Sequence, residues 1–144
     1  MIQLATPGIV ALDTAVFIYY IERRPEYAEA VRPIFQAYSR GEIEIVTSSI
    51  TLLEVLVKPY RAADPKLALD YEDILTRSDG LRMIDVDRGQ LMFAARLQAH
   101  HGLKKPDALQ IAAALTTGCS AFITNDKRLP DIPGLSIIQL RDLH

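Results

Sequence analysis

Two acidic residues, Asp13 and Asp126, stand just after short apolar runs in the sequence. The runs at 9–12 and 121–123 have the length and composition of strands that are buried on both faces of a parallel sheet. The carboxyl ends of parallel strands meet at one edge of a sheet, and active sites form at this edge. We therefore expect these two carboxylates to lie close together.

Two further acids lie in segments that are predicted to be helical and are otherwise apolar. Glu54 falls within 50–57, and Asp107 follows Pro106 at the head of an apolar stripe that passes through Ile111. Burying an ionised carboxylate costs free energy unless the group is paired, hydrogen-bonded or bound to a metal. Both positions therefore indicate a functional site.

These four acidic residues form one candidate site: Asp13, Glu54, Asp107 and Asp126. If they met, their charges would repel one another, and a divalent cation would relieve that repulsion. Mg²⁺ and Mn²⁺ prefer oxygen ligands, and Mg²⁺ keeps several waters while it binds a few carboxylates and a substrate phosphate. Such a site suits phosphodiester hydrolysis, because the metal can activate water, hold the phosphate and stabilise the leaving oxygen.

Each acid also has an ordinary structural explanation. Asp13 can cap a helix that starts at Thr14, and Asp126 can belong to a turn. Asp107 can interact with a helix dipole, and Glu54 can point outward into solvent. Capping and turns do not account for the whole set, so a shared site is the better interpretation.

The chain alternates between short apolar runs and longer helical patterns. Strands are expected at 9–12, 43–46, 81–86 and 121–123, with a further candidate at 136–138. Helices are expected at 14–22, 26–40, 50–58, 65–77, from a cap at Asp87 to His100 or His101, and from Pro106 to Gly118. This alternation predicts a single α/β domain over 1–144, with a central, mainly parallel sheet of four to five strands.

Composition sets the broad class of protein. The 144 residues are 49% hydrophobic and 24% charged, and the formal net charge of -2 neither favours nor excludes a nucleic-acid partner. The single cysteine, Cys119, is expected to be a buried thiol in a reducing compartment. We see no signal peptide and no membrane span, so a cytoplasmic protein without a membrane partner is expected.

Four segments resemble, in order and spacing, the signature blocks of the PIN-domain family. Each contains one of the four acids: VALDTAVFIYY (10–20), SSITLLEV (48–55), KPDALQIAAA (105–114) and FITNDKRL (122–129). The resemblance covers essentially the whole chain. It implies a PIN-like three-layer α/β/α sandwich and a Mg²⁺- or Mn²⁺-dependent endoribonuclease whose catalytic and metal-binding residues are the four acids. A domain of this length most resembles the VapC toxins of prokaryotic type II toxin–antitoxin systems.

The same resemblance assigns supporting roles to three polar residues beside the acids: Thr14, Thr124 and Asn125. Thr124 would occupy the small hydroxyl position that often supports the last acid. One departure is Ala15, where many relatives carry Asn or Ser. That difference puts a supporting hydrogen bond in doubt and leaves the acids in place.

Partners are suggested by the basic and aromatic residues. Three basic residues beside the acids can be solvated surface charge or can contact RNA phosphates: Lys105, Lys127 and Arg128. Six aromatic residues in the first two expected helices can pack in the core or form an apolar groove: Phe17, Tyr19, Tyr20, Tyr27, Phe35 and Tyr38. By resemblance, the groove would bind an antitoxin and the chain would form a homodimer.

Two other functions are alternatives to a metal-dependent ribonuclease. A phosphatase of the haloacid dehalogenase type also has an Asp after its first strand, but it needs a second Asp where this chain has Ala15. A non-catalytic PIN domain would only bind RNA or protein. Such relatives usually lack one or more acids, whereas this chain has all four.

Overall fold

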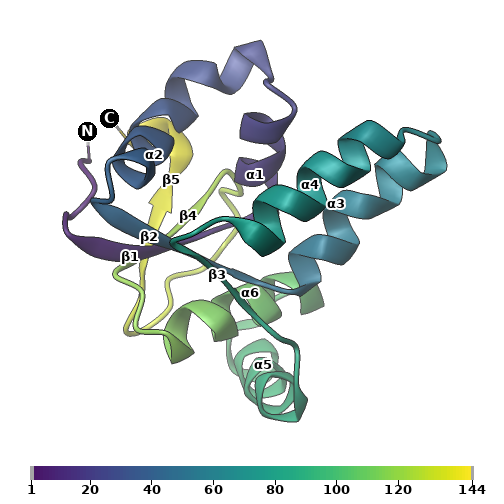
Figure 1. Ribbon diagram of the computed structural model, residues 1–144. Helices are drawn as coiled ribbons and strands as arrows, with labels where there is room; N and C mark the ends of the chain where they lie inside the picture. The colour runs from purple at the N-terminus through teal and green to yellow at the C-terminus, as the bar shows by residue number, and fades with distance from the viewer. Residues whose placement is uncertain (1, 144) are drawn as a thin grey trace.

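The computed structural model describes residues 2–143 and centres on one sheet of five strands in the order β3-β2-β1-β4-β5 (Figure 1). All neighbouring strands are parallel. The strands are β1 (Gly8–Leu12), β2 (Ile43–Ser48), β3 (Leu81–Ile84), β4 (Ala121–Thr124) and β5 (Ser136–Gln139). The predicted parallel α/β sheet is confirmed, and it includes the fifth strand.

Helices cover both faces of this sheet (Figure 1). One apolar cluster joins the sheet to α1–α4, and a second joins it to α5 and α6. The helices are α1 (Thr14–Ile21), α2 (Ala28–Ser39), α3 (Ile50–Arg61), α4 (Pro65–Arg77), α5 (Arg88–His101) and α6 (Lys105–Thr116), with 3-10 turns η1 (Pro25–Tyr27) and η2 (Leu140–Asp142). Within residues 2–143, every helix is too short or too polar to cross a membrane.

The central strands β1 and β4 are almost wholly apolar because both of their faces are buried. In β1, Val10 and Leu12 belong to the cluster under α1–α4, whereas Ala11 belongs to the cluster under α5 and α6. In β4, Ile123 and Phe122 divide in the same way. Side chains alternate between the two faces of a strand, so a covered sheet needs apolar residues at consecutive positions.

Several element boundaries differ from the predictions. The helix expected from residue 26 starts as the 3-10 turn η1 and becomes α-helical at Ala28. Helix α3 continues past Pro59 to Arg61, although a proline inside a helix removes one backbone hydrogen bond and its ring crowds the carbonyl four residues earlier. Strand β3 ends at Ile84.

The carboxyl ends of β1 and β4 lie side by side. Leu12 pairs with Ile123, and the backbone N–H of Asp13 donates to the carbonyl of Ile123 at 2.9 Å. From β1 the chain goes to β2 and β3 on one side of the sheet, and then to β4 and β5 on the other. This is the switch point at which open α/β sheets bind their ligands, and it brings Asp13 next to Thr124.

Candidate functional site

Asp13 lies between β1 and α1, and both of its carboxylate oxygens accept hydrogen bonds. The backbone N–H of Thr14 donates to Oδ1 at 2.8 Å, and the hydroxyl of Thr124 donates to Oδ2 at 2.7 Å. Burial raises the pKa of Asp13 above its usual range, although these two hydrogen bonds oppose the shift. Asp13 therefore caps α1, as its structural explanation predicts, and is also a fixed and partly desolvated carboxylate.

Glu54 is exposed on α3, which corrects the expectation of an acid buried in an apolar helix. Only one face of α3 is covered, so Val55 is 2% exposed whereas Leu53 is 62% exposed. Glu54 is nevertheless held in place, because the hydroxyl of Thr14 donates to its Oε1 at 2.7 Å. The sequence pattern therefore misjudged the burial of this residue.

Asp107 occupies the first turn of α6 and is half-buried. Burial is the main reason that the pKa of Asp107 is raised to about 6, and repulsion from Asp13, Asp126 and Glu54 adds to it. The positive charge of Lys104 acts in the opposite direction. Thr14 hydrogen-bonds to both Asp13 and Glu54, Thr124 hydrogen-bonds to both Asp13 and Asp126, and Asp107 and Asp126 line one small cavity. Four carboxylates from four different elements therefore converge on this region.

Asp126 forms a turn just beyond β4. Its Oδ1 accepts from the backbone N–H of Arg128 at 2.9 Å and from the Arg128 Nε at 3.1 Å. These two hydrogen bonds hold the pKa of Asp126 below its usual range. The turn explanation for Asp126 is therefore right, and the same turn presents an ionised carboxylate to the site.

The two residues that precede Asp126 in this turn have different roles. The hydroxyl of Thr124 accepts from the backbone N–H of Asp126 at 3.0 Å while it donates to Asp13. Thr124 therefore hydrogen-bonds to the backbone of Asp126 and to the carboxylate of Asp13. Asn125 contacts no acid and instead donates to the hydroxyl of Tyr19 at 3.1 Å.

Gln110 lies behind the acids and is not among the site residues predicted from the sequence. It is 2% exposed on α6. Its Nε2 donates to the hydroxyl of Thr14 at 3.0 Å and to that of Thr51 at 2.6 Å. The available signal was an uncharged polar residue between Leu109 and Ile111 in an otherwise apolar helix.

A small cavity of about 130 Å³ opens beside the acids. Its walls include two acids and two basic residues of the site: Lys104, Asp107, Asp126 and Arg128. Of the three predicted substrate contacts, Arg128 lines this cavity. Lys105 and Lys127 are exposed and lie outside its lining.

The geometry suits a hydrated cation better than a caged one. Among residues 2–143, no three His, Cys, Asp or Glu side chains are arranged to enclose a metal ion. Mg²⁺ usually keeps several waters and binds through one or two carboxylates together with substrate phosphates. Acids that are near enough to raise the pKa of Asp107, yet are not packed together, fit such an ion.

The family profile described as "PIN domain" matches residues 10–135, a span that contains all four acids. The chain belongs to the PIN-domain family. No protein of curated function matches it.

Solved structures with the fold of this PIN domain include toxin–antitoxin proteins. VapBC2 from Rickettsia felis, bound to a promoter DNA fragment, has a TM-score of 0.70 at 18% identity, over 91% of this chain and 98% of that one. DNA-bound VapBC from Salmonella typhimurium has a TM-score of 0.70 at 23% identity, over 92% and 98%. The sarcin-ricin loop cleaving toxin VapC20 of Mycobacterium tuberculosis has a TM-score of 0.67 at 15% identity, over 83% and 92%. At these identities the likeness establishes the fold.

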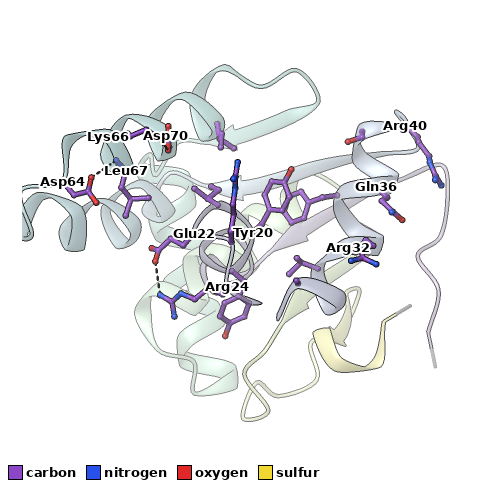
Figure 2. Close-up of a pocket in the computed structure, with 18 residues that line it drawn as sticks. Tyr20, Glu22, Arg24, Arg32, Gln36, Arg40, Asp64, Lys66, Leu67 and Asp70 are labelled. Carbon is purple, nitrogen blue, oxygen red and sulfur yellow. Dashed lines mark hydrogen bonds and ion pairs between the residues drawn. The ribbon is translucent and has the colours of Figure 1, made fainter. Parts of the chain in front are cut away.

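This PIN domain also has a groove of about 1150 Å³ between α1, α2 and α4 (Figure 2). Three of the six aromatic residues noted in the sequence line it: Tyr19, Tyr20 and Phe35. Tyr20 is 43% exposed and stacks on Phe35 with ring centroids 3.6 Å apart, whereas Phe17 is fully buried in the core. Aromatic residues therefore lie both in the core and in a groove, but arginine, lysine and acidic side chains also line this groove, so it is not the apolar groove expected from the sequence.

Proposed function

We propose that this PIN domain is a Mg²⁺- or Mn²⁺-dependent endoribonuclease. The observation that carries the proposal is the convergence of four carboxylates, which are linked through the hydrogen bonds of Thr14 and Thr124 and through one shared cavity. Their mutual repulsion adds to the burial that raises the pKa of Asp107 to about 6. A divalent cation would remove the repulsion among them. Membership of the PIN-domain family supports the same activity.

The four acids would hold the hydrated cation, one or two of them directly and the others through its waters: Asp13, Glu54, Asp107 and Asp126. When bound, Mg²⁺ would activate water for attack and stabilise the negative charge that develops on the phosphate and the leaving oxygen. Hydrolysis by this route needs no side-chain nucleophile and would leave a 5′-phosphate and a 3′-hydroxyl.

The chain's own residues would prepare the site for this reaction. The hydrogen bonds to Asp13 fix its orientation. The hydrogen bond from Thr14 to Oε1 holds the Glu54 carboxylate in place and leaves Oε2 available for a ligand. Lys104 and Arg128, which line the small cavity, would contact the scissile phosphate or its neighbours.

The finer assignment is the toxin of a type II toxin–antitoxin pair, with RNA as substrate, a cognate antitoxin as partner and a homodimer as assembly. The names of the fold neighbours and the aromatic groove support it. A neighbouring short gene for a DNA-binding protein with a disordered tail would be expected. Sedimentation equilibrium should give twice the chain mass of 16.0 kDa.

The catalytic proposal is tested by RNA cleavage with wild-type protein and Asp13→Asn, each with and without EDTA. We expect Asp13→Asn to abolish cleavage and EDTA to abolish it reversibly, with recovery when Mg²⁺ is added in excess. The control is Asp131→Asn, which alters an exposed acid outside the site and should cut normally. Undiminished cleavage by Asp13→Asn, or in EDTA, would contradict the proposal.

Metal titration separates this function from a non-catalytic PIN domain. A ribonuclease should take up Mn²⁺ in a way that Glu54→Gln or Asp107→Asn weakens. A domain that only binds RNA or protein should show no uptake that depends on these residues.

A further inference from the structure

Gln110 is a buried amide at the centre of a polar network that joins four elements. It lies on α6 and reaches residues of β2, α1 and α3. Its Oε1 accepts from the backbone N–H of Ser48 at 3.3 Å, and its Nε2 donates to Thr14 and Thr51. Thr51 in turn hydrogen-bonds to the hydroxyl of Thr47 at 2.7 Å. A polar cluster this deep must have its hydrogen bonds satisfied, and each partner here is protein.

The direction of these hydrogen bonds follows from the chemistry of the groups. The backbone N–H of Ser48 can only donate, so the Gln110 atom that faces it must be the oxygen. The Gln110 nitrogen therefore faces the two hydroxyls and can only donate to them. A hydroxyl has one hydrogen, and that of Thr14 is left free to donate elsewhere.

Glu54 is the acceptor that this leaves for Thr14. Its Oε1 lies 2.7 Å from the Thr14 hydroxyl oxygen, whereas the Thr51 hydroxyl lies at 3.4 Å. The shorter contact has the length of a hydroxyl-to-carboxylate bond. The donor chain thus runs in one direction, from Gln110 through Thr14 to the carboxylate of Glu54.

The chain matters because Glu54 is exposed. An exposed Glu samples many rotamers, and ordering it costs side-chain entropy. A hydrogen bond from a buried and fully oriented hydroxyl holds one oxygen and leaves the other available. This is how a solvent-exposed carboxylate can act as a preorganised metal ligand.

We propose that Gln110 is a positioning residue for Glu54, acting through the Thr14 hydroxyl. The proposal rests on the proposed metal site. Gln110 touches neither metal nor substrate: it fixes the direction of the Thr14 hydrogen, and Thr14 fixes the carboxylate. A purely structural amide would stabilise the packing of α6 on β2 without affecting how Glu54 binds an ion.

The test measures Mn²⁺ affinity of the full chain by electron paramagnetic resonance, together with the thermal midpoint of each metal-free variant. Thr14→Val removes the hydroxyl at nearly constant volume, and Thr14→Ser keeps it. Gln110→Met keeps the length of the side chain and removes its donor. We expect Thr14→Val and Gln110→Met to weaken Mn²⁺ binding by about 10–100-fold, and Thr14→Ser to bind as the wild type does.

A double-mutant cycle adds a readout that loss of packing would not change. In a Glu54→Gln background, Thr14→Val should weaken Mn²⁺ binding no further, because both changes break one path. Equal weakening in both backgrounds, or wild-type affinity in Thr14→Val, would overturn the positioning role. Wild-type Mn²⁺ affinity in a folded Gln110→Met would overturn the role of Gln110, and Gln110→Leu takes its place if that variant does not fold. Wild-type protein that takes up no Mn²⁺ would instead defeat the proposed function, and this inference with it.

Discussion

At the scale of single residues, Asp107 is the acid of the site whose ionisation costs the most free energy in the metal-free protein. Its folded-state pKa of about 6 lies above the ordinary value of 3.8. The folded protein therefore holds this proton more tightly than the unfolded chain does. The stability that this group contributes is complete below its ordinary pKa and is lost as the pH rises through about 6.

We therefore predict that Asp107→Asn stabilises the metal-free protein at pH 7, by about 1–2 kcal/mol once solvent screening is allowed for. The difference from wild type should shrink as the pH falls toward 4, where the wild-type carboxyl is protonated. Urea unfolding in EDTA at several pH values measures it. A variant no more stable than wild type at pH 7 would argue against the raised pKa of Asp107.

Two neighbouring lysines offer a matched comparison for substrate binding. Lys104 lines the small cavity and its charge acts on Asp107, whereas Lys105 is exposed outside that cavity. We predict that Lys104→Ala raises KM for RNA and lowers the salt dependence of binding by about one phosphate contact. Lys105→Ala should have a much smaller effect. A larger effect of Lys105→Ala than of Lys104→Ala in steady-state kinetics would contradict this prediction.

At the scale of elements, the strands and their acids were predictable because the signals are local. An unbroken apolar run such as Ile9–Leu12 predicts a strand covered on both faces, and the residue after it must lie at the sheet edge. That is why Asp13 and Asp126 could be located from the chain alone. Their place just after an apolar run in the sequence predicts their place at the sheet edge in the fold.

The network behind the acids was not predictable, since it depends on contacts between distant segments. Gln110 and Thr14 are 96 residues apart in sequence and meet only when α6 packs on the sheet. The exposure of Glu54 has the same origin, because it depends on which face of α3 receives α4. Apolar composition alone does not separate the covered face of a helix from its open face.

A second polar contact fixes α1 and α3, the helices that carry Thr14 and Glu54. Glu22, just beyond α1, accepts hydrogen bonds from the buried Tyr71 hydroxyl of α4 and from Arg24 at 3.1 Å. Lys58 of α3 lies 3.5 Å from the same carboxylate. The contact ties together the helix that carries Thr14, the helix that carries the exposed acid and their neighbour α4.

We predict that Tyr71→Phe destabilises the protein by about 1–3 kcal/mol, because it removes a hydrogen bond to a partly buried carboxylate and leaves the ring in place. Tyr60→Phe is the control, since Tyr60 is 63% exposed and its change should fall within about 0.5 kcal/mol. Urea unfolding of both variants gives the comparison. Equal stability of the two variants would show that the hydrogen bond from Tyr71 to Glu22 contributes little.

At the scale of the whole molecule, the groove and the acids are adjacent. Helix α1 begins at Thr14, beside the acids, and Tyr20 near its other end lines the groove. The two ends are roughly 9 Å apart along the helix. Tyr19 also lines the groove and accepts a hydrogen bond from Asn125, the neighbour of Asp126. A protein segment bound in the groove would therefore sit within reach of the site.

If the toxin assignment is right, Tyr20 should be an anchor for the partner. Its exposed ring, backed by Phe35, resembles the rigid aromatic residues that dominate binding energies. We predict that Tyr20→Ser weakens inhibition of RNA cleavage by the adjacent gene's product by about 10-fold or more. Tyr60→Ser changes a similarly exposed tyrosine outside the groove lining, and inhibition should persist in it. Inhibition curves against partner concentration distinguish the two, and equal weakening in both variants would place the partner elsewhere.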